Sequence, residues 1–167
     1  MAILPSVRRT PPPGAPGSRS VERRTYVQAS PRDVWIVLHD PAQAPSLFPE
    51  VALEPAAPTW PAAATTRRGL NRLGPIGGTA RVESLEARPG STFRVRVDAR
   101  GVRSEWTWVL EPRAGGTRVV HVATIEPRGR FGGLLVRLAG ASLPARVEGH
   151  LTTLKQLAES SPTSRRS

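Results

Sequence analysis

Three histidines are the side chains in this sequence best suited to proton transfer near neutral pH: His39, His121 and His150. Imidazole titrates close to physiological pH, so each of them can act as a general acid or base. They are far apart in the sequence, and none has a metal-ligand spacing such as HxxxH or HExxH. We therefore expect no metal site and ask which of the three lies beside a ligand.

His121 is the first candidate for a catalytic residue because of the strand on which it lies. Counting by two from Val119, it shares a face with Ala123 and Ile125, and this apolar face should point into the protein. An imidazole there can exchange a proton with a carbonyl or phenol of a ligand. The alternative is a core histidine that hydrogen-bonds to a neighbour.

The other two histidines belong to predicted helices. His150 lies one turn before Leu154 and can flank the apolar stripe of the last helix, where it would meet His121 across a cavity if the register allows. Its alternative position is the solvated edge of that helix. His39 ends a short helix, where a charged imidazole would interact favourably with the helix dipole.

Arg67 and Arg68 open a weakly marked strand, and alternation points one of them inward. We take Arg68 as the candidate. An inward guanidinium would bind a carboxylate, phenolate or enolate of a ligand and so assist catalysis. The alternative is a solvated arginine on the outer face of the sheet, paired with Glu83 or Glu86.

Several other chemistries are excluded by what the sequence lacks. It contains no cysteine, so thiolate nucleophiles, thiolate metal sites and disulfides are excluded. It has neither a GxSxG nucleophile elbow nor a GxxxxGK[ST] phosphate loop. Glu83, Glu105 and Glu126 alternate outward, which leaves no acidic pair on an apolar face. We expect no cofactor.

The elements that must position these side chains are mainly strands that alternate apolar and polar residues between glycine-containing turns. Such a pattern is typical of an antiparallel meander with one wet face. Strands are predicted at 21–29, 51–58, 62–71, 79–85, 92–97, 102–110 and 117–126. Phe93, Trp106 and Trp108 fall on the apolar face, where their rings either line a cavity suited to a polycyclic or isoprenoid ligand or fill the core.

Helices are predicted at 31–39, at 42–48 and over a long C-terminal segment. Ser30, Pro31 and Asp33 form a good start for the first of them. The C-terminal helix carries one continuous apolar stripe, made of Val136, Gly140, Leu143, Val147, Leu151, Leu154 and Ala158. Pro144 lies inside the stripe and should kink the helix. We expect Leu143, Val147, His150 and Leu151 to line the ligand cavity. The fold class is α+β.

Charge and composition divide the chain into a body and two tails. Lysine and arginine number 24 against 13 acidic residues, a net charge of +11, and all but one of the basic residues are arginine. Residues 1–20 form a proline-rich basic tail that we expect to be disordered, 21–159 one folded domain, and 160–167 a second disordered tail. No apolar run is long enough to span a membrane and no secretory signal is visible, so we expect a cytoplasmic location.

Three segments carry a family resemblance: residues 27–35 with His39 and Asp40, residues 110–119, and residues 151–157. They resemble the START-like, or SRPBCC, helix-grip superfamily, which includes polyketide cyclases and dehydrases and lipid-transfer proteins. The likeness covers residues 21–159 and departs from the family pattern at 55–64, where proline and alanine replace the expected strand. It implies a curved seven-stranded antiparallel sheet wrapped around a long C-terminal helix, with a cavity between them.

The expected function is therefore binding of a small hydrophobic ligand, a polyketide, quinone or lipid, in that cavity. One alternative is an enzyme of the polyketide cyclase or dehydrase kind, which would use His121 or an inward Arg68 to promote enolisation and loss of water. A second alternative is a basic surface module for nucleic acid or anionic membrane. The arginine excess also fits codon bias, so we do not expect nucleic acid to be the main partner.

Overall fold

The computed structural model describes residues 16–55, 59–72 and 77–160. Of the two expected tails, 1–15 and 161–167 lie outside the described residues. The first strand begins at Arg19, two residues before the expected start of the domain, and the last helix ends at Ser160.

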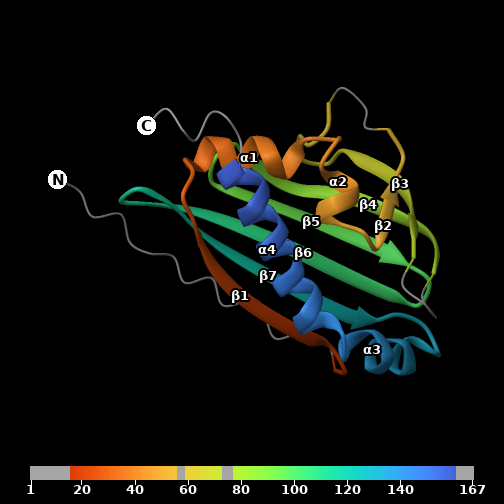
Figure 1. Ribbon diagram of the computed structural model, residues 1–167. Helices are drawn as coiled ribbons and strands as arrows, with labels where there is room; N and C mark the ends of the chain where they lie inside the picture. Colours follow the sequence, from red (N-terminus) through yellow and green to blue (C-terminus); the bar gives the residue numbers. More distant parts are fainter. Residues whose placement is uncertain (1–15, 56–58, 73–76, 161–167) are drawn as a thin grey trace, which may run out of the picture.

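Seven strands form one antiparallel sheet in the order β1-β7-β6-β5-β4-β3-β2, which curves around the C-terminal helix (Figure 1). They are β1 Arg19–Val27, β2 Val51–Leu53, β3 Thr66–Asn71, β4 Gly78–Arg88, β5 Thr92–Ala99, β6 Val102–Arg113 and β7 Gly116–Pro127. The predicted helix-grip α+β fold is confirmed. The third strand is shorter than expected because it starts at Thr66, after the segment rich in proline and alanine.

Two short helices follow β1, as predicted. The first, α1 (Pro31–His39), has the expected bounds, and its cap explains them: the Ser30 hydroxyl accepts a hydrogen bond from the Asp33 backbone N–H at 3.2 Å. The second, α2 (Ala44–Leu47), is shorter than the 42–48 expected. The first lies beside the end of the C-terminal helix, and the second lies beside β2 (Figure 1).

The expectation of one kinked C-terminal helix is wrong. The segment forms two helices, α3 (Gly132–Gly140) and α4 (Leu143–Ser160), separated at Ala141 and Ser142. Pro144 is the second residue of α4, a position where its missing N–H costs nothing. The proline therefore starts a new helix. The predicted stripe is nevertheless buried along its whole length, and α4 lies across the concave face of the sheet (Figure 1).

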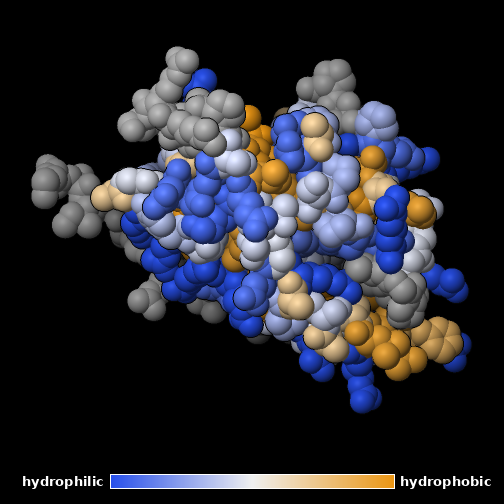
Figure 2. Space-filling view, viewed as in Figure 1, coloured by the Kyte–Doolittle hydropathy of each residue, from blue (hydrophilic) through white to orange (hydrophobic). Residues whose placement is uncertain are grey.

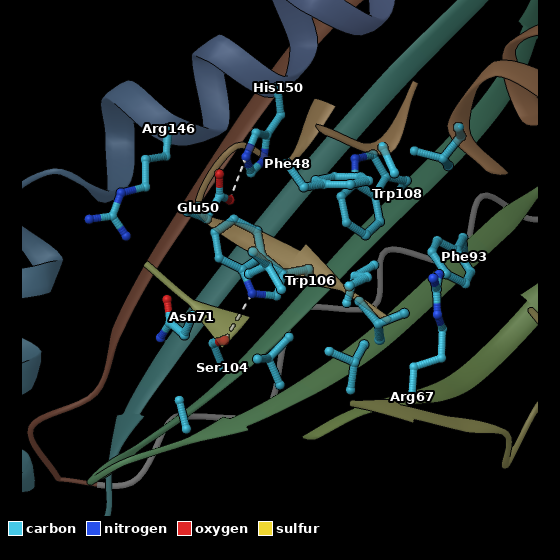
Figure 3. Close-up of a pocket in the computed structure, with 18 of the residues that line it drawn as sticks. Phe48, Glu50, Arg67, Asn71, Phe93, Ser104, Trp106, Trp108, Arg146 and His150 are labelled. Atoms are coloured by element: carbon cyan, nitrogen blue, oxygen red, sulfur yellow. Dashed lines mark hydrogen bonds and ion pairs between the residues drawn. The ribbon is translucent and has the colours of Figure 1, made fainter. Parts of the chain in front are cut away.

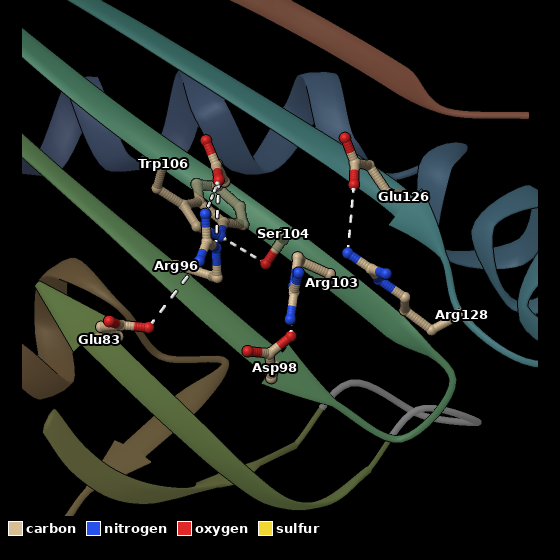
Figure 4. Close-up of polar contacts among 9 residues, drawn as sticks. Glu83, Arg96, Asp98, Arg103, Ser104, Trp106, Glu126 and Arg128 are labelled. Carbon is tan, nitrogen blue, oxygen red and sulfur yellow. Dashed lines mark hydrogen bonds and ion pairs between the residues drawn. The ribbon is translucent and has the colours of Figure 1, made fainter. Parts of the chain in front are cut away.

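The two faces of the sheet differ as the alternation predicts. Along β6 the buried residues are Val102, Ser104, Trp106, Trp108 and Leu110. The intervening residues carry ion pairs on the other face (Figure 4), among them Arg96 with Glu105 at 2.8 Å and Arg103 with Asp98 at 2.6 Å. Such partly exposed pairs add little stability but keep the outer face solvated.

Two glycines give opposite predictions for the same substitution. A Cβ at Gly116 would collide with the carbonyl oxygen of Val27 on the paired strand, so we expect Gly116→Ala to lower the free energy of unfolding by about 2–3 kcal/mol. A Cβ at Gly149, inside α4, would meet nothing within 4 Å. Gly149→Ala should therefore raise it by about 0.5–1 kcal/mol. Urea unfolding measures both, and equal effects would contradict the prediction.

Candidate functional site

A pocket with a volume of about 110 Å³ lies between the concave face of the sheet, the α1–α2 segment and the first half of α4 (Figure 3). This is several times the roughly 10–15 Å³ that one water needs, so the pocket has room for a small organic group. Most of its lining is apolar and includes Phe48, Leu53, Trp60, Val82, Phe93, Val95, Val97, Trp106, Trp108 and Leu143.

Aromatic rings make up much of this wall. The rings of Phe93 and Trp108 are stacked with their centroids 5.7 Å apart, and Phe48 meets Trp108 edge-on at 5.5 Å. The indole N–H of Trp106 donates to the Ser104 hydroxyl at 2.9 Å, so that this buried donor is satisfied within the wall. Phe93, Trp106 and Trp108 thus belong to the core and to the pocket lining at once.

His121 lies behind this wall and does not line the pocket. Its side chain is fully buried, and its ring is stacked on Trp108 with a centroid distance of 4.3 Å. Its Nδ1 lies 3.0 Å from the carbonyl oxygen of Thr107. Burial lowers the pKa of His121 to about 3, so the imidazole is neutral at pH 7. Direct contact between His121 and a ligand would need the wall to move.

His150 connects His121 to the pocket. The Thr107 carbonyl can only accept, so Nδ1 of His121 carries the hydrogen and its Nε2 accepts from Nδ1 of His150, at 3.2 Å. On its other side, Nε2 of His150 lies 2.7 Å from a carboxylate oxygen of Glu50, an ion-pair distance without an aligned hydrogen bond.

This chain of groups places an acid–base pair on the pocket wall. Both Glu50 and His150 line the pocket (Figure 3), and His150 is only 4% exposed. Arg146, one turn before His150 on α4, also lines it and interacts with the charge of Glu50, while burial lowers the pKa of Arg146. Sequence reasoning missed Glu50 because it follows Pro49 in a connection without any periodicity. The expected meeting of His121 and His150 occurs, but not across the pocket, because only His150 lines it.

The choice of Arg68 as the inward arginine is wrong. Arg68 is exposed, whereas Arg67 lines the pocket and pairs across the sheet with Val82, which faces the same way. The alternation misleads here because Leu70, on the Arg68 face, is itself 51% exposed.

Arg67 is held against the pocket by two contacts. Its guanidinium carbon lies 5.3 Å from the centre of the Trp60 ring, and its Nε donates to the backbone oxygen of Glu54 at 3.1 Å. Partial burial lowers its pKa from the usual arginine value. Arginine remains charged at neutral pH, so this end of the pocket carries a cation.

The helix α4 contributes fewer lining residues than expected. Leu143 and His150 line the pocket as predicted, but Val147 and Leu151 do not. Both are buried in the core and do not border the pocket. At 3.6 residues per turn, the surface that carries 143, 146 and 150 differs from the surface that carries 147 and 151.

His39 has a role that its position in the sequence did not indicate. Its Nδ1 lies 2.9 Å from the carbonyl oxygen of Trp35, and its ring lies between Trp35 and Phe93 at 4.1 and 4.4 Å. Burial lowers its pKa to about 4, so the expected charge–dipole interaction is absent at pH 7. Nε2 is buried without a hydrogen-bond partner among the described residues, and His39 lines the pocket. This nitrogen can accept a hydrogen bond from a ligand.

Neither a metal centre nor a membrane span is indicated in the part of the chain that the structure describes. No group of three or more histidine, cysteine, aspartate or glutamate side chains there is arranged to hold a metal ion. Among the helices of those same residues, none is long and apolar enough to cross a bilayer.

The sequence matches a known protein family over residues 18–159, described as polyketide cyclase / dehydrase and lipid transport. No curated protein sequence matches the chain. Among solved structures, the protein TTHA0849 from Thermus thermophilus is 29% identical, with 86% of this chain and 100% of that one covered and a TM-score of 0.65.

Two more distant structures share the fold. The ZhuI aromatase/cyclase from Streptomyces sp. R1128 is 17% identical, with 85% of this chain and 94% of that one covered and a TM-score of 0.67. Norcoclaurine synthase from Thalictrum flavum is 14% identical, with coverages of 86% and 88% and a TM-score of 0.62. At these identities the likeness concerns the fold alone.

Proposed function

Because the chain belongs to the polyketide cyclase/dehydrase and lipid transport family, we propose that it binds a small hydrophobic ligand in the pocket between its sheet and α4. The observation that carries this proposal is the lining itself, in which aromatic and aliphatic side chains surround a few polar groups. Pockets of this composition bind apolar molecules and fix their orientation with the polar groups. Burial of apolar surface, at about 25 cal/mol per Å², provides most of the binding free energy before association costs.

The polar groups favour a particular kind of ligand. A flat apolar body fits among the rings of Phe93, Trp106 and Trp108. A carboxylate, phenolate or enolate oxygen would pair with the partly buried cation of Arg67. A hydroxyl group would donate to the unpartnered nitrogen of His39. Polyketides and quinones carry such oxygens on flat frameworks, which makes them the ligand classes that we propose first.

A filled pocket provides the first test. Val97 lines the pocket from β5, whereas Val109 lies on the outer face of β6. We expect Val97→Phe to weaken binding of N-phenylnaphthylamine, a dye that fluoresces in apolar surroundings, by about tenfold or more, because the larger side chain occupies space that the dye needs; tenfold corresponds to about 1.4 kcal/mol. Val109→Phe is the matched control and should bind the dye normally. Equal affinity in both variants would place the dye elsewhere and contradict the proposal.

A second candidate function is catalysis, which the Glu50–His150 pair favours. The pair lies at the wall of an apolar pocket, backed by His121, and a carboxylate or imidazole in this place can accept a proton from a carbon next to a carbonyl. Returning a proton to a departing hydroxyl group would release water, so the net reaction is a dehydration. The remainder of the catalysis would be positioning of a flexible substrate.

One experiment separates a carrier from an enzyme. Native mass spectrometry of the expressed protein identifies a retained ligand, which is then incubated with fresh protein. Turnover that falls by about 100-fold or more in Glu50→Gln, and is also lost in His121→Ala, supports the enzyme. Glu83→Gln, on the outer face, is the control and should keep full activity. Recovery of the ligand unchanged from all variants supports the carrier.

A further inference from the structure

The helix α3 presents an apolar face to solvent. Phe131, at its N-terminal boundary, is 75% exposed, and Leu134 and Leu138 are 58% and 54% exposed. Their spacing of three and four residues puts the three side chains on one side of the helix. They form an orange patch at the edge of the molecule where α3 lies (Figure 2).

The opposite side of α3 holds the helix in place. Val136 and Ala139 are buried in the core, and Leu135 packs against Gly101, at the turn between β5 and β6. A Cβ on Gly132 would come within 2.8 Å of the backbone oxygen of Gly101, so the helix begins in close contact with this turn. The three outward side chains therefore cannot turn into the core without removing the inner ones.

The surroundings of the patch are strongly cationic. Arg128, Arg130 and Arg137 are all exposed, and residues 127–147 contain no aspartate or glutamate. Arg128 has only a distant ion pair, 3.9 Å from Glu126. Within the described part of the chain, Arg130 and Arg137 make no ion pair.

We propose that α3 docks this protein on the surface of an anionic membrane. Phe131, Leu134 and Leu138 enter the boundary between headgroups and acyl chains, and the arginines bind lipid phosphates and carboxylates. Apolar side chains on one face with arginines beside them are typical of helices that lie in the membrane interface. Charge complementarity identifies the partner: a net charge of +11 and an acid-free segment favour an anionic lipid surface over a protein.

The docking helix is next to the ligand pocket. Ala139 at the end of α3 lines the pocket together with Leu143 and Arg146 of α4. Docking would bring this wall near the bilayer and let an apolar ligand pass between membrane and pocket without crossing water. This last step rests on the proposed ligand binding, whereas the docking itself depends only on the surface of α3.

Vesicle flotation tests the docking. The full chain should float with vesicles of phosphatidylcholine and phosphatidylserine, mixed at roughly three to one, and not with phosphatidylcholine alone. Binding should weaken as salt is added, because exposed charges are screened. Arg130→Gln and Arg137→Gln should each lower the affinity about fivefold, as about 1 kcal/mol is lost per arginine near the surface. Equal binding to both kinds of vesicle would contradict the role of charge.

The apolar side chains have a matched control. The triple variant Phe131→Ser, Leu134→Ser, Leu138→Ser should lose at least about tenfold in affinity for the mixed vesicles. Ile36 and Leu70 are exposed to a similar degree, 54% and 51%, but lie on other elements. The double variant Ile36→Ser, Leu70→Ser should bind as the unchanged chain does. If both the triple and the double variant lose affinity for the vesicles, or if neither does, the proposal is overturned.

Site-specific labelling reports insertion directly, since the sequence contains no cysteine. A nitrobenzoxadiazole label on Phe131→Cys should brighten and shift to the blue with the mixed vesicles, while the same label on Ile36→Cys should not. If the triple variant changed its oligomeric state and still bound vesicles normally, the patch would be a contact between two copies of this chain. That result would overturn the proposal. N-phenylnaphthylamine binding, measured without vesicles, separately reports whether the pocket works.

Discussion

Lowering the pH from 7 to 5 is expected to destabilise the folded protein by about 4 kcal/mol. His39 is partly buried and His121 fully buried, both as neutral imidazoles, with the pKa lowered from 6.5 to about 4 and about 3. Below pH 6.5 the unfolded chain takes up protons that the native state excludes, so the free energy of unfolding decreases as the pH is lowered. Each pKa unit corresponds to about 1.4 kcal/mol, hence about 2 kcal/mol for each histidine by pH 5. Total stability is commonly only about 5–15 kcal/mol.

Urea unfolding at closely spaced pH values between 7 and 5 measures this loss. Carboxyl groups ordinarily titrate near pH 4, so they contribute little in this window. His39→Asn supplies the control: an amide N–H can replace the Nδ1–H that donates to Trp35, but it cannot be protonated. This variant should lose about half of the pH dependence. A slope equal to that of the unchanged chain would show that His39 takes up a proton as readily in the folded protein as in the unfolded chain, which would contradict the prediction.

Replacing Trp108 by alanine is expected to cost about 3–5 kcal/mol of unfolding free energy. The ring is 3% exposed and lies within 5.7 Å, centroid to centroid, of Phe48, Phe93 and His121. The substitution leaves a large cavity and removes the ring on which His121 is stacked. Dye binding in the pocket should also fall, because the stacked wall is lost.

Trp60→Ala is the matched control for Trp108. Trp60 also lines the pocket, but it is only partly buried and meets Phe93 edge-on at 6.2 Å. We expect less than half the loss of stability, measured by urea unfolding at pH 7. If Trp60→Ala proved as costly as Trp108→Ala, the core would extend further toward β2 and β3 than the burial of these side chains indicates.

The sequence predicted the sheet well because antiparallel strands with one wet face alternate strictly. In β6 the even-numbered residues, among them Trp106 and Trp108, were predicted to face the core, and the odd-numbered ones, among them Arg103 and Glu105, to face outward. The structure confirms this prediction. The same alternation led to the wrong choice of inward arginine at β3, near the edge of the sheet. There Leu70 is apolar and yet exposed, so apolar character does not indicate the buried face. The apolar pattern also failed to distinguish one helix from two, since the apolar stripe continues in phase across the break at Ser142.

The candidate site was only partly predictable for a related reason. His121 and His150 were identified because each belongs to a periodic element. Glu50, Arg146 and the buried nitrogen of His39 were not, since nothing local distinguishes them from solvated residues. Their environment is produced by segments distant in sequence, which remove water from one side and supply a charge or ring on the other.

By itself, the sequence determined the α+β class, the strand faces, the first helix with its cap and the buried stripe of the C-terminal segment. These follow from short-range rules, in which the identity of a residue and its neighbours two to four positions away sets the local conformation. Only the tertiary structure decided that His39 and His121 are neutral, which arginine faces the pocket and how Glu50 meets His150. Those properties depend on distances and solvent exclusion between remote segments, which sheet register and helix rotation fix together.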